Sequence, residues 1–260
     1  MTTTIAIAGK GGTGKTTLAA LIIKMLSREG AVLAIDADPA TNLNMALGTS
    51  LSDTIGAIRE GMAAQVKKGQ FQAGISKQDY LELQVSQALV EGERIDLLAM
   101  GRPEGPGCYC AANNMLRQII DRMSRSYDYV VIDCEAGMEH ISRQTTRDID
   151  ILLLVSDPSL RGIVTAGRMK ALMGELRTSV GRICLAVNRV NGDLSPTLIQ
   201  AIEKEGLDLI ATLPVDPALE AIEVRGSPVV ELPEDAPLYQ AVRAIILKLG
   251  LPVAQTAAKE

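Results

Sequence analysis

A glycine-rich loop near the start of the chain limits its fold more than any other segment. Residues Gly9 to Thr16 (GKGGTGKT) match the phosphate-loop pattern GxxxxGK[ST] at every position. Such a loop directs several backbone N–H groups toward one point, and the helix that follows adds the positive end of its dipole. An apolar strand precedes the loop and an amphipathic helix, Thr16 to Arg28, follows it. The chain is therefore predicted to bind a nucleotide polyphosphate here.

The side chains of this loop have separate expected roles. Lys15 reaches the β- and γ-phosphates, and the Thr16 hydroxyl ligates Mg²⁺. The glycines are required because a Cβ would hold the backbone away from the phosphate. The predicted nucleotide-binding residues of the loop are Gly11, Gly12, Thr13, Gly14, Lys15, Thr16 and Thr17.

The composition favours one α/β domain covering residues 1–260. Apolar residues make up 47% of the chain and aromatic residues 2%, so the core must consist of aliphatic side chains, which suits strands between helices. A net charge of −5 without any Lys/Arg-rich run argues against nucleic-acid binding. No apolar stretch approaches the roughly 18 residues that cross a bilayer. We expect a cytoplasmic protein that binds neither nucleic acid nor membrane.

Short apolar segments alternate with helical patterns along most of the chain. This alternation predicts a mostly parallel, twisted sheet with helices on both faces, in which ligands bind beyond the carboxyl ends of the strands. The stretch at about 51–93 is less regular and is predicted to be a mobile helical insertion. The predicted strands are Ile5–Ala8, Val32–Asp36, Ile95–Met100, Tyr129–Asp133, Ile151–Ser156, Ile183–Asn188 and Leu209–Thr212.

Acidic side chains follow two of these strands. Asp36 is assigned to the water shell of Mg²⁺, because a buried carboxylate needs a cation or hydrogen bonds to compensate for its burial. Asp38 is assigned to positioning the attacking water, although Asp38-Pro39 also suits a helix N-cap. Asp133 is assigned as the second Mg²⁺ carboxylate, and Gly137 completes a DxxxG pattern that can approach the γ-phosphate.

A base pocket is predicted from two other strand ends. The Asn188 amide is expected to hydrogen-bond an adenine edge, with Pro214 and Asp216 forming the opposite wall. Ordinary loop residues would look the same in the sequence, so that alternative stays open.

The loop and the strand-end acids together resemble the deviant Walker A ATPases, a family that includes MinD, ParA and the nitrogenase iron protein. The resemblance rests on Lys10 before the phosphate loop, on Asp36-Ala37-Asp38-Pro39 and on Asp133-Cys134-Glu135-Ala136-Gly137, and it covers most of the chain. It implies a P-loop NTPase of the SIMIBI class that hydrolyses ATP with Mg²⁺ and forms a homodimer around ATP. It also implies that Lys10 acts across the dimer interface on the other subunit's phosphates, as a catalytic group beside Lys15 and Asp38.

A second motif, Cys108-Tyr109-Cys110, precedes a helix predicted at about Asn113 to Arg125. Two thiolates bind soft or borderline metals, and a twofold dimer would bring four of them together. A redox pair or two unremarkable small side chains are the alternatives. The chain has four cysteines, too few for a secreted disulfide framework.

Within the family, this CxC motif and Gly137-Met138-Glu139-His140 resemble the CooC-type nickel-insertion ATPases of carbon monoxide dehydrogenase and the related acetyl-CoA synthase maturation factors. The resemblance implies Ni²⁺, or Zn²⁺ in the same site, bound by Cys108 and Cys110 of both subunits and delivered to such a client enzyme. The alternative is an ATP-dependent electron carrier with a bridging [4Fe–4S] cluster. His140 is interpreted as a hydrogen-bonded structural or coupling residue, with a metal-ligand role as the alternative. Cys184 is interpreted as a buried apolar side chain.

Overall fold

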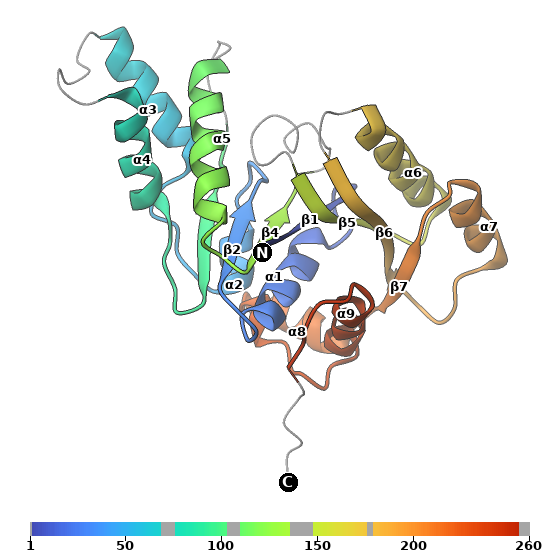
Figure 1. Cartoon of the computed structure of the whole chain (residues 1–260). Coiled ribbons are helices and arrows are strands. Elements are labelled where there is room, and N and C mark those ends of the chain that lie inside the picture. Colours follow the sequence, from blue (N-terminus) through green and yellow to red (C-terminus); the bar gives the residue numbers. More distant parts are fainter. Residues whose placement is uncertain (1, 69–75, 103–109, 136–147, 176–178, 255–260) are drawn as a thin grey trace.

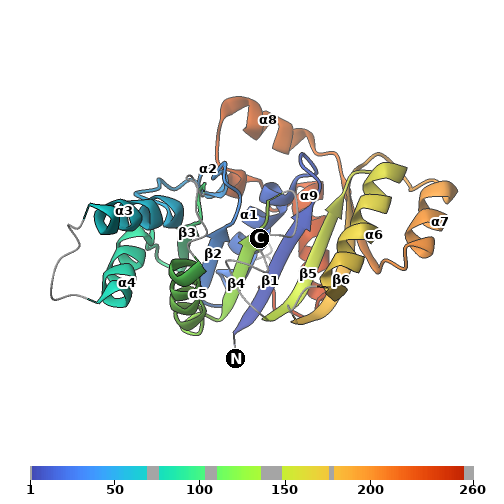
Figure 2. The same cartoon turned by 90° about the horizontal axis from the view of Figure 1, so that it is seen from above.

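One parallel sheet organises the chain. The computed structural model describes residues 2–68, 76–102, 110–135, 148–175 and 179–254. Seven strands lie in the order β3-β2-β4-β1-β5-β6-β7, and neighbouring strands pair in parallel (Figures 1 and 2). The predicted fold class is confirmed. The strands are β1 (Thr3–Gly9), β2 (Val32–Asp36), β3 (Ile95–Ala99), β4 (Tyr129–Asp133), β5 (Asp148–Ser156), β6 (Ser179–Val190) and β7 (Leu209–Pro214).

Four strands, β1, β5, β6 and β7, are longer than predicted, and β5 and β6 gain the most residues at their starts. β5 begins at Asp148 and β6 at Ser179, where the two residues pair with each other. Their first residues are polar or exposed, so the apolar pattern that identified the strands does not extend to these ends. Backbone pairing continues beyond the core because the hydrogen bonds of a sheet do not require apolar side chains.

Helices cover both faces of the sheet, as Figure 2 shows. Side chains of α1, α2, α8 and α9 join one hydrophobic core, and those of α3 to α7 join the other. No helix in the described part of the chain is long and apolar enough to cross a membrane. The helices are α1 (Lys15–Leu26), α2 (Leu43–Leu47), α3 (Ile55–Lys67), α4 (Lys77–Ala88), α5 (Cys110–Ser124), α6 (Leu160–Glu175), α7 (Pro196–Lys204), α8 (Pro217–Arg225) and α9 (Pro237–Lys248), with a 3₁₀ turn η2 (Val229–Glu231).

The irregular stretch at 51–93 contains two well-capped helices. The hydroxyl of Thr54 accepts a hydrogen bond from the first turn of α3, and Ser76 does the same for α4. Leu81 and Val85 of α4 are buried in the core that covers one sheet face. These helices therefore form part of the cover of the sheet.

We predict that core packing on the α9 side contributes measurably to stability. Val242 in α9 is fully buried, whereas Val224 in α8 is 88% exposed. Val242→Ala should lower the free energy of unfolding by about 2 kcal/mol, since it removes two buried carbons and leaves a cavity. The same change at Val224 should alter it by less than about 0.5 kcal/mol. Urea denaturation of both variants checks this, and equal effects would contradict the packing.

Candidate nucleotide-binding site

The candidate site lies at the carboxyl ends of three adjacent strands, β2, β4 and β1. In the register of the sheet, Asp36 pairs with Asp133 and Asp133 pairs with Ile7. The phosphate loop follows β1 directly, so the loop and both acids meet at one edge. The predicted convergence of strand ends is therefore present in the structure.

Internal hydrogen bonds hold the phosphate loop in shape. The Thr13 hydroxyl donates to the carbonyl oxygen of Lys10 at 2.9 Å, and the Lys15 ammonium donates to the same oxygen at 3.3 Å. Gly12 and Gly14 have φ angles of 78° and 89°, which favour glycine over any residue with a side chain. Lys15 is buried, so its charge lies inside the loop.

The Thr16 hydroxyl and the Asp133 carboxylate are in direct contact. Thr16 Oγ1 donates to Asp133 Oδ2 at 2.6 Å, while Asp133 Oδ1 is buried and has no hydrogen-bond partner. Burial raises the pKa of Asp133 to about 7, and the nearby Asp36 carboxylate adds to the shift. A hydroxyl beside a buried, unpaired carboxylate oxygen fits Mg²⁺, which prefers oxygen ligands and would neutralise this charge.

Asp36 has more hydrogen bonds than its neighbour. Its two carboxylate oxygens accept the backbone N–H groups of Asp38 and Leu43, at 3.0 and 2.9 Å. Burial raises the pKa of Asp36 to about 6, and these two bonds oppose the rise. Asp36 therefore holds the first turn of α2, a structural role that the sequence did not reveal.

Asp38 is half-buried and lies in the turn after β2. Its Oδ1 accepts the N–H of Ala40 at 2.8 Å, and the N-cap of the next helix, α2, is Asn42. The alternative of Asp38 as a helix N-cap is therefore wrong. The assignment of Asp38 to positioning the attacking water stays a prediction.

Lys10 is paired with an acid that was not predicted. Its ammonium lies 3.8 Å from Asp157 Oδ2, and both side chains are partly exposed. Asp157 follows β5, which is the neighbour of β1 in the sheet. The strand-end rule that identified Asp36 and Asp133 would also have selected Asp157, had it been applied to this strand.

The three residues predicted to form a base pocket have defined local contacts. Asn188 Nδ2 donates to the Thr13 carbonyl at 2.8 Å. Asp216 is buried, and its two oxygens accept the N–H groups of Ala218 and Leu238 at 2.9 and 2.8 Å. Pro214 is the last residue of β7. Asp216 thus caps α8 and holds the start of α9, while Asn188 contacts the phosphate loop.

The structure describes only part of the predicted metal site. Cys108, Gly137 and His140 lie outside the described residues, and Cys110 is the first residue of α5, which begins three residues earlier than predicted. Among the described residues, no cluster of three or more His, Cys, Asp or Glu could hold a metal ion.

The two remaining cysteines are buried. Cys184 is inaccessible in β6, as predicted, and burial raises the pKa of its thiol to about 11. Cys134 directly follows Asp133 and is also buried, and burial raises its pKa further. Neither thiol is therefore suited to bind metal as a thiolate in this structure.

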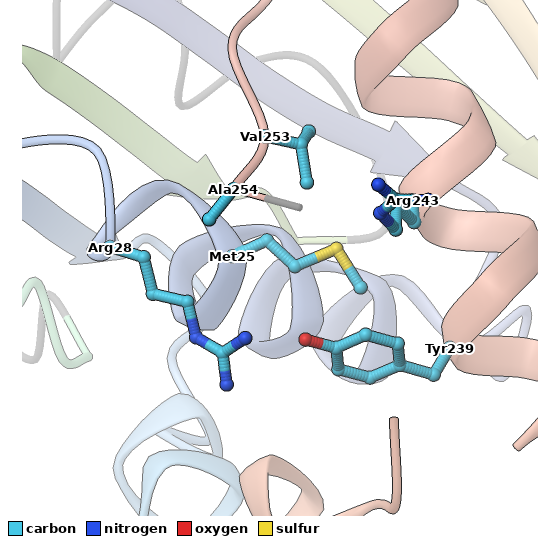
Figure 3. Close-up of a pocket in the computed structure, with 6 residues that line it drawn as sticks. All are labelled: Met25, Arg28, Tyr239, Arg243, Val253 and Ala254. Atoms are coloured by element: carbon cyan, nitrogen blue, oxygen red, sulfur yellow. The ribbon is translucent and has the colours of Figure 1, made fainter. Parts of the chain in front are cut away.

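A small pocket is lined by residues of α1 and α9 (Figure 3). Met25 lies near the end of α1, whereas the phosphate loop precedes the start of that helix. Its volume of about 10 Å³ corresponds to roughly one water molecule. A nucleotide needs a far larger space, so this pocket is no candidate for the substrate. Its lining residues are Met25, Arg28, Tyr239, Arg243, Val253 and Ala254.

Proteins of similar sequence include ATP-binding proteins. Residues 2–180 match a family model described as an AAA domain. The ATP-binding protein MJ0685 of Methanocaldococcus jannaschii is 42% identical over 246 residues, which cover 94% of this chain and 97% of that protein. The carbon monoxide dehydrogenase accessory protein CooC of Rhodospirillum rubrum is 32% identical over 236 residues, 85% of this chain and 87% of CooC.

A solved structure shares the fold. The septum site-determining protein MinD of Pyrococcus horikoshii, complexed with Mg-ADP, superposes with a TM-score of 0.68. The alignment covers 96% of each chain at 21% identity. At 21% identity this similarity establishes the fold alone. Membership of the family rests on the two relatives above.

We predict that Gly14→Ala weakens nucleotide binding more than tenfold, or about 1.4 kcal/mol. A Cβ at Gly14 would lie 2.4 Å from Asn188 Nδ2, and the φ of 89° strains any residue with a side chain. Gly61→Ala is the control, because no atom lies within 4 Å of a Cβ there. Calorimetric titration with MgATP measures both, and equal affinities would contradict the loop geometry.

We also predict that Asp133→Asn stabilises the protein when Mg²⁺ and nucleotide are absent. A carboxyl group whose pKa rises on folding stabilises the fold below its unfolded pKa, near 4, and this contribution is lost as the pH rises through about 7. The variant should therefore gain about 2 kcal/mol over the natural protein at pH 8 and little at pH 4. Urea denaturation in EDTA at both pH values is the measurement. A gain in the free energy of unfolding that does not depend on pH would contradict the raised pKa of the buried Asp133 carboxyl group.

Proposed function

The chain belongs to the AAA-domain family of MinD/ParA-type ATPases related to CooC, and on that premise we propose that it is an ATP-dependent nickel metallochaperone. In this proposal a homodimer binds Ni²⁺ between its subunits and supports nickel insertion into a client, carbon monoxide dehydrogenase or acetyl-CoA synthase. The observation that carries it is the Cys108-Tyr109-Cys110 motif in a chain 32% identical to CooC.

The proposed ATP site uses the residues gathered at the strand ends. Lys15 and the loop backbone bind the phosphates, and Thr16, Asp36 and Asp133 hold Mg²⁺ directly or through water. Mg²⁺ supplies charge neutralisation at the β- and γ-phosphates. Asp38 orients the attacking water, which is the main requirement because positioning and electrostatics provide most of the catalysis in phosphoryl transfer.

Lys10 contributes only in the proposed dimer. Its ammonium is partly exposed and paired with Asp157 at 3.8 Å, and an exposed pair of this kind contributes about 0–1 kcal/mol. Such a weak pair can be exchanged for a phosphate of a second subunit at little cost. ATP binding would then complete both the catalytic site and the metal site at one interface.

The metal site is proposed to need both subunits. One CxC motif supplies two thiolates, and a closed site needs four, which a twofold axis provides. Cys110 is the first residue of α5. Because thiolates bind Ni²⁺ and Zn²⁺ alike, Zn²⁺ is expected to compete for the same site.

We predict that Cys108→Ser abolishes stoichiometric Ni²⁺ binding while ATPase activity is retained. The substitution removes a metal ligand and leaves the phosphate loop and its acids unchanged. Cys184→Ala is the matched control, because that cysteine is buried in β6 and should not affect metal binding. Equilibrium dialysis with Ni²⁺, with and without a non-hydrolysable ATP analogue, measures the stoichiometry, expected at one ion per dimer.

Two outcomes would overturn the nickel proposal. Unchanged Ni²⁺ binding by the Cys108→Ser variant would show that Cys108 is not a ligand of the metal. Iron and acid-labile sulfide in anaerobically purified protein, lost in the same variant, would instead favour a [4Fe–4S] electron carrier, which requires the same four thiolates.

A further inference from the structure

The small pocket in Figure 3 has a basic side chain on either side. Arg28 follows the end of α1 and Arg243 belongs to α9, and both line the pocket beside Tyr239. The volume of about 10 Å³ gives room for one water molecule or one monatomic ion. The side chains around the pocket determine which of the two it favours.

Arg28 has an acidic partner, whereas one donor of Arg243 has none. The Arg28 guanidinium donates to the Glu234 carboxylate and forms an ion pair with it. The Nε atom of Arg243 is buried and has no hydrogen-bond partner among the described residues. A buried N–H group without an acceptor is costly, and the cost is larger when the group is charged. The Arg243 side chain therefore needs an acceptor that the described part of the chain does not supply.

Positive charge exceeds negative charge around this pocket. Three cationic side chains lower the pKa of the Glu234 carboxyl group, first of all its partner Arg28. The other two are Lys24 and Arg243. The Lys24 ammonium lies 5.2 Å from the centre of the Tyr239 ring, and burial together with the Arg28 charge lowers the pKa of Lys24. One carboxylate thus faces three cations at the place where the Arg243 donor is unpaired.

We propose that this pocket binds one small anion of the halide class, which accepts the hydrogen bond of Arg243 Nε and compensates the excess positive charge. A water molecule would accept the same hydrogen bond but would leave the charge uncompensated. Phosphate and sulfate have five heavy atoms each and exceed the volume of one water molecule. The site uses none of the residues assigned to ATP or nickel, so it goes beyond the proposed function and can be tested separately from it.

A bound anion would join the end of α1 to α9, so chloride should stabilise the folded protein. Thermal unfolding is followed in sodium chloride and in sodium gluconate of the same ionic strength, with saturating MgADP so that the phosphate loop is occupied. At ten times its dissociation constant, chloride should raise the unfolding midpoint by about 3 °C, and the rise should saturate. Arg243→Met removes the charge and the donor at a similar side-chain length, and should abolish this rise.

Arg225→Met is the matched control, because Arg225 is exposed at the end of α8 and the effect of chloride should survive this change. Crystals soaked in sodium bromide locate the site independently, since the anomalous signal of bromide should appear beside Arg243. A midpoint that does not depend on chloride, an effect of chloride that Arg243→Met retains, or a pocket without bromide would overturn the proposal. If Arg243→Met does not fold, the bromide experiment on the natural protein decides.

Discussion

Two buried carboxylates on neighbouring strands determine what this fold can do. Asp36 and Asp133 pair in the register of β2 and β4, and burial raises the pKa of both. Two buried carboxylates at this separation destabilise the fold when both are ionised and no cation is near. A bound cation at this edge of the sheet would remove that destabilisation. The phosphate loop, with Lys15 and Thr16, lies beside these acids, where Mg²⁺ and a nucleotide can bind.

The parallel sheet explains why distant segments of the chain meet there. Parallel strands all end at the same edge, so residues far apart in sequence, such as Thr13 and Asn188, become hydrogen-bonded neighbours. The helices on both faces bury the strands, which allows the interior to be aliphatic and leaves polar chemistry to the strand ends. The parallel arrangement of the strands therefore explains both the aliphatic core and the position of the site.

Much of this arrangement could be predicted because it depends on local patterns. Apolar runs identified the seven strands, and the glycine pattern identified the loop. What was missed depends on contacts between distant segments: the pairing of Lys10 with Asp157, the capping of α2 by Asp36 and the double capping by Asp216. Each of these contacts depends on the register of the strands or on the approach of distant segments, which local sequence patterns do not specify. The early start of α5 was missed because its first residues are small and carry no helical periodicity.

The burial of Cys134 and Cys184 simplifies the chemistry of the folded protein. Both thiols are almost inaccessible and both are less acidic than a free cysteine. Alkylating reagents and oxidants attack thiolates that solvent can reach, so these two positions are protected in the native state. Reagents should therefore reach Cys134 and Cys184 only when the protein unfolds, so that modification of these two thiols reports on unfolding.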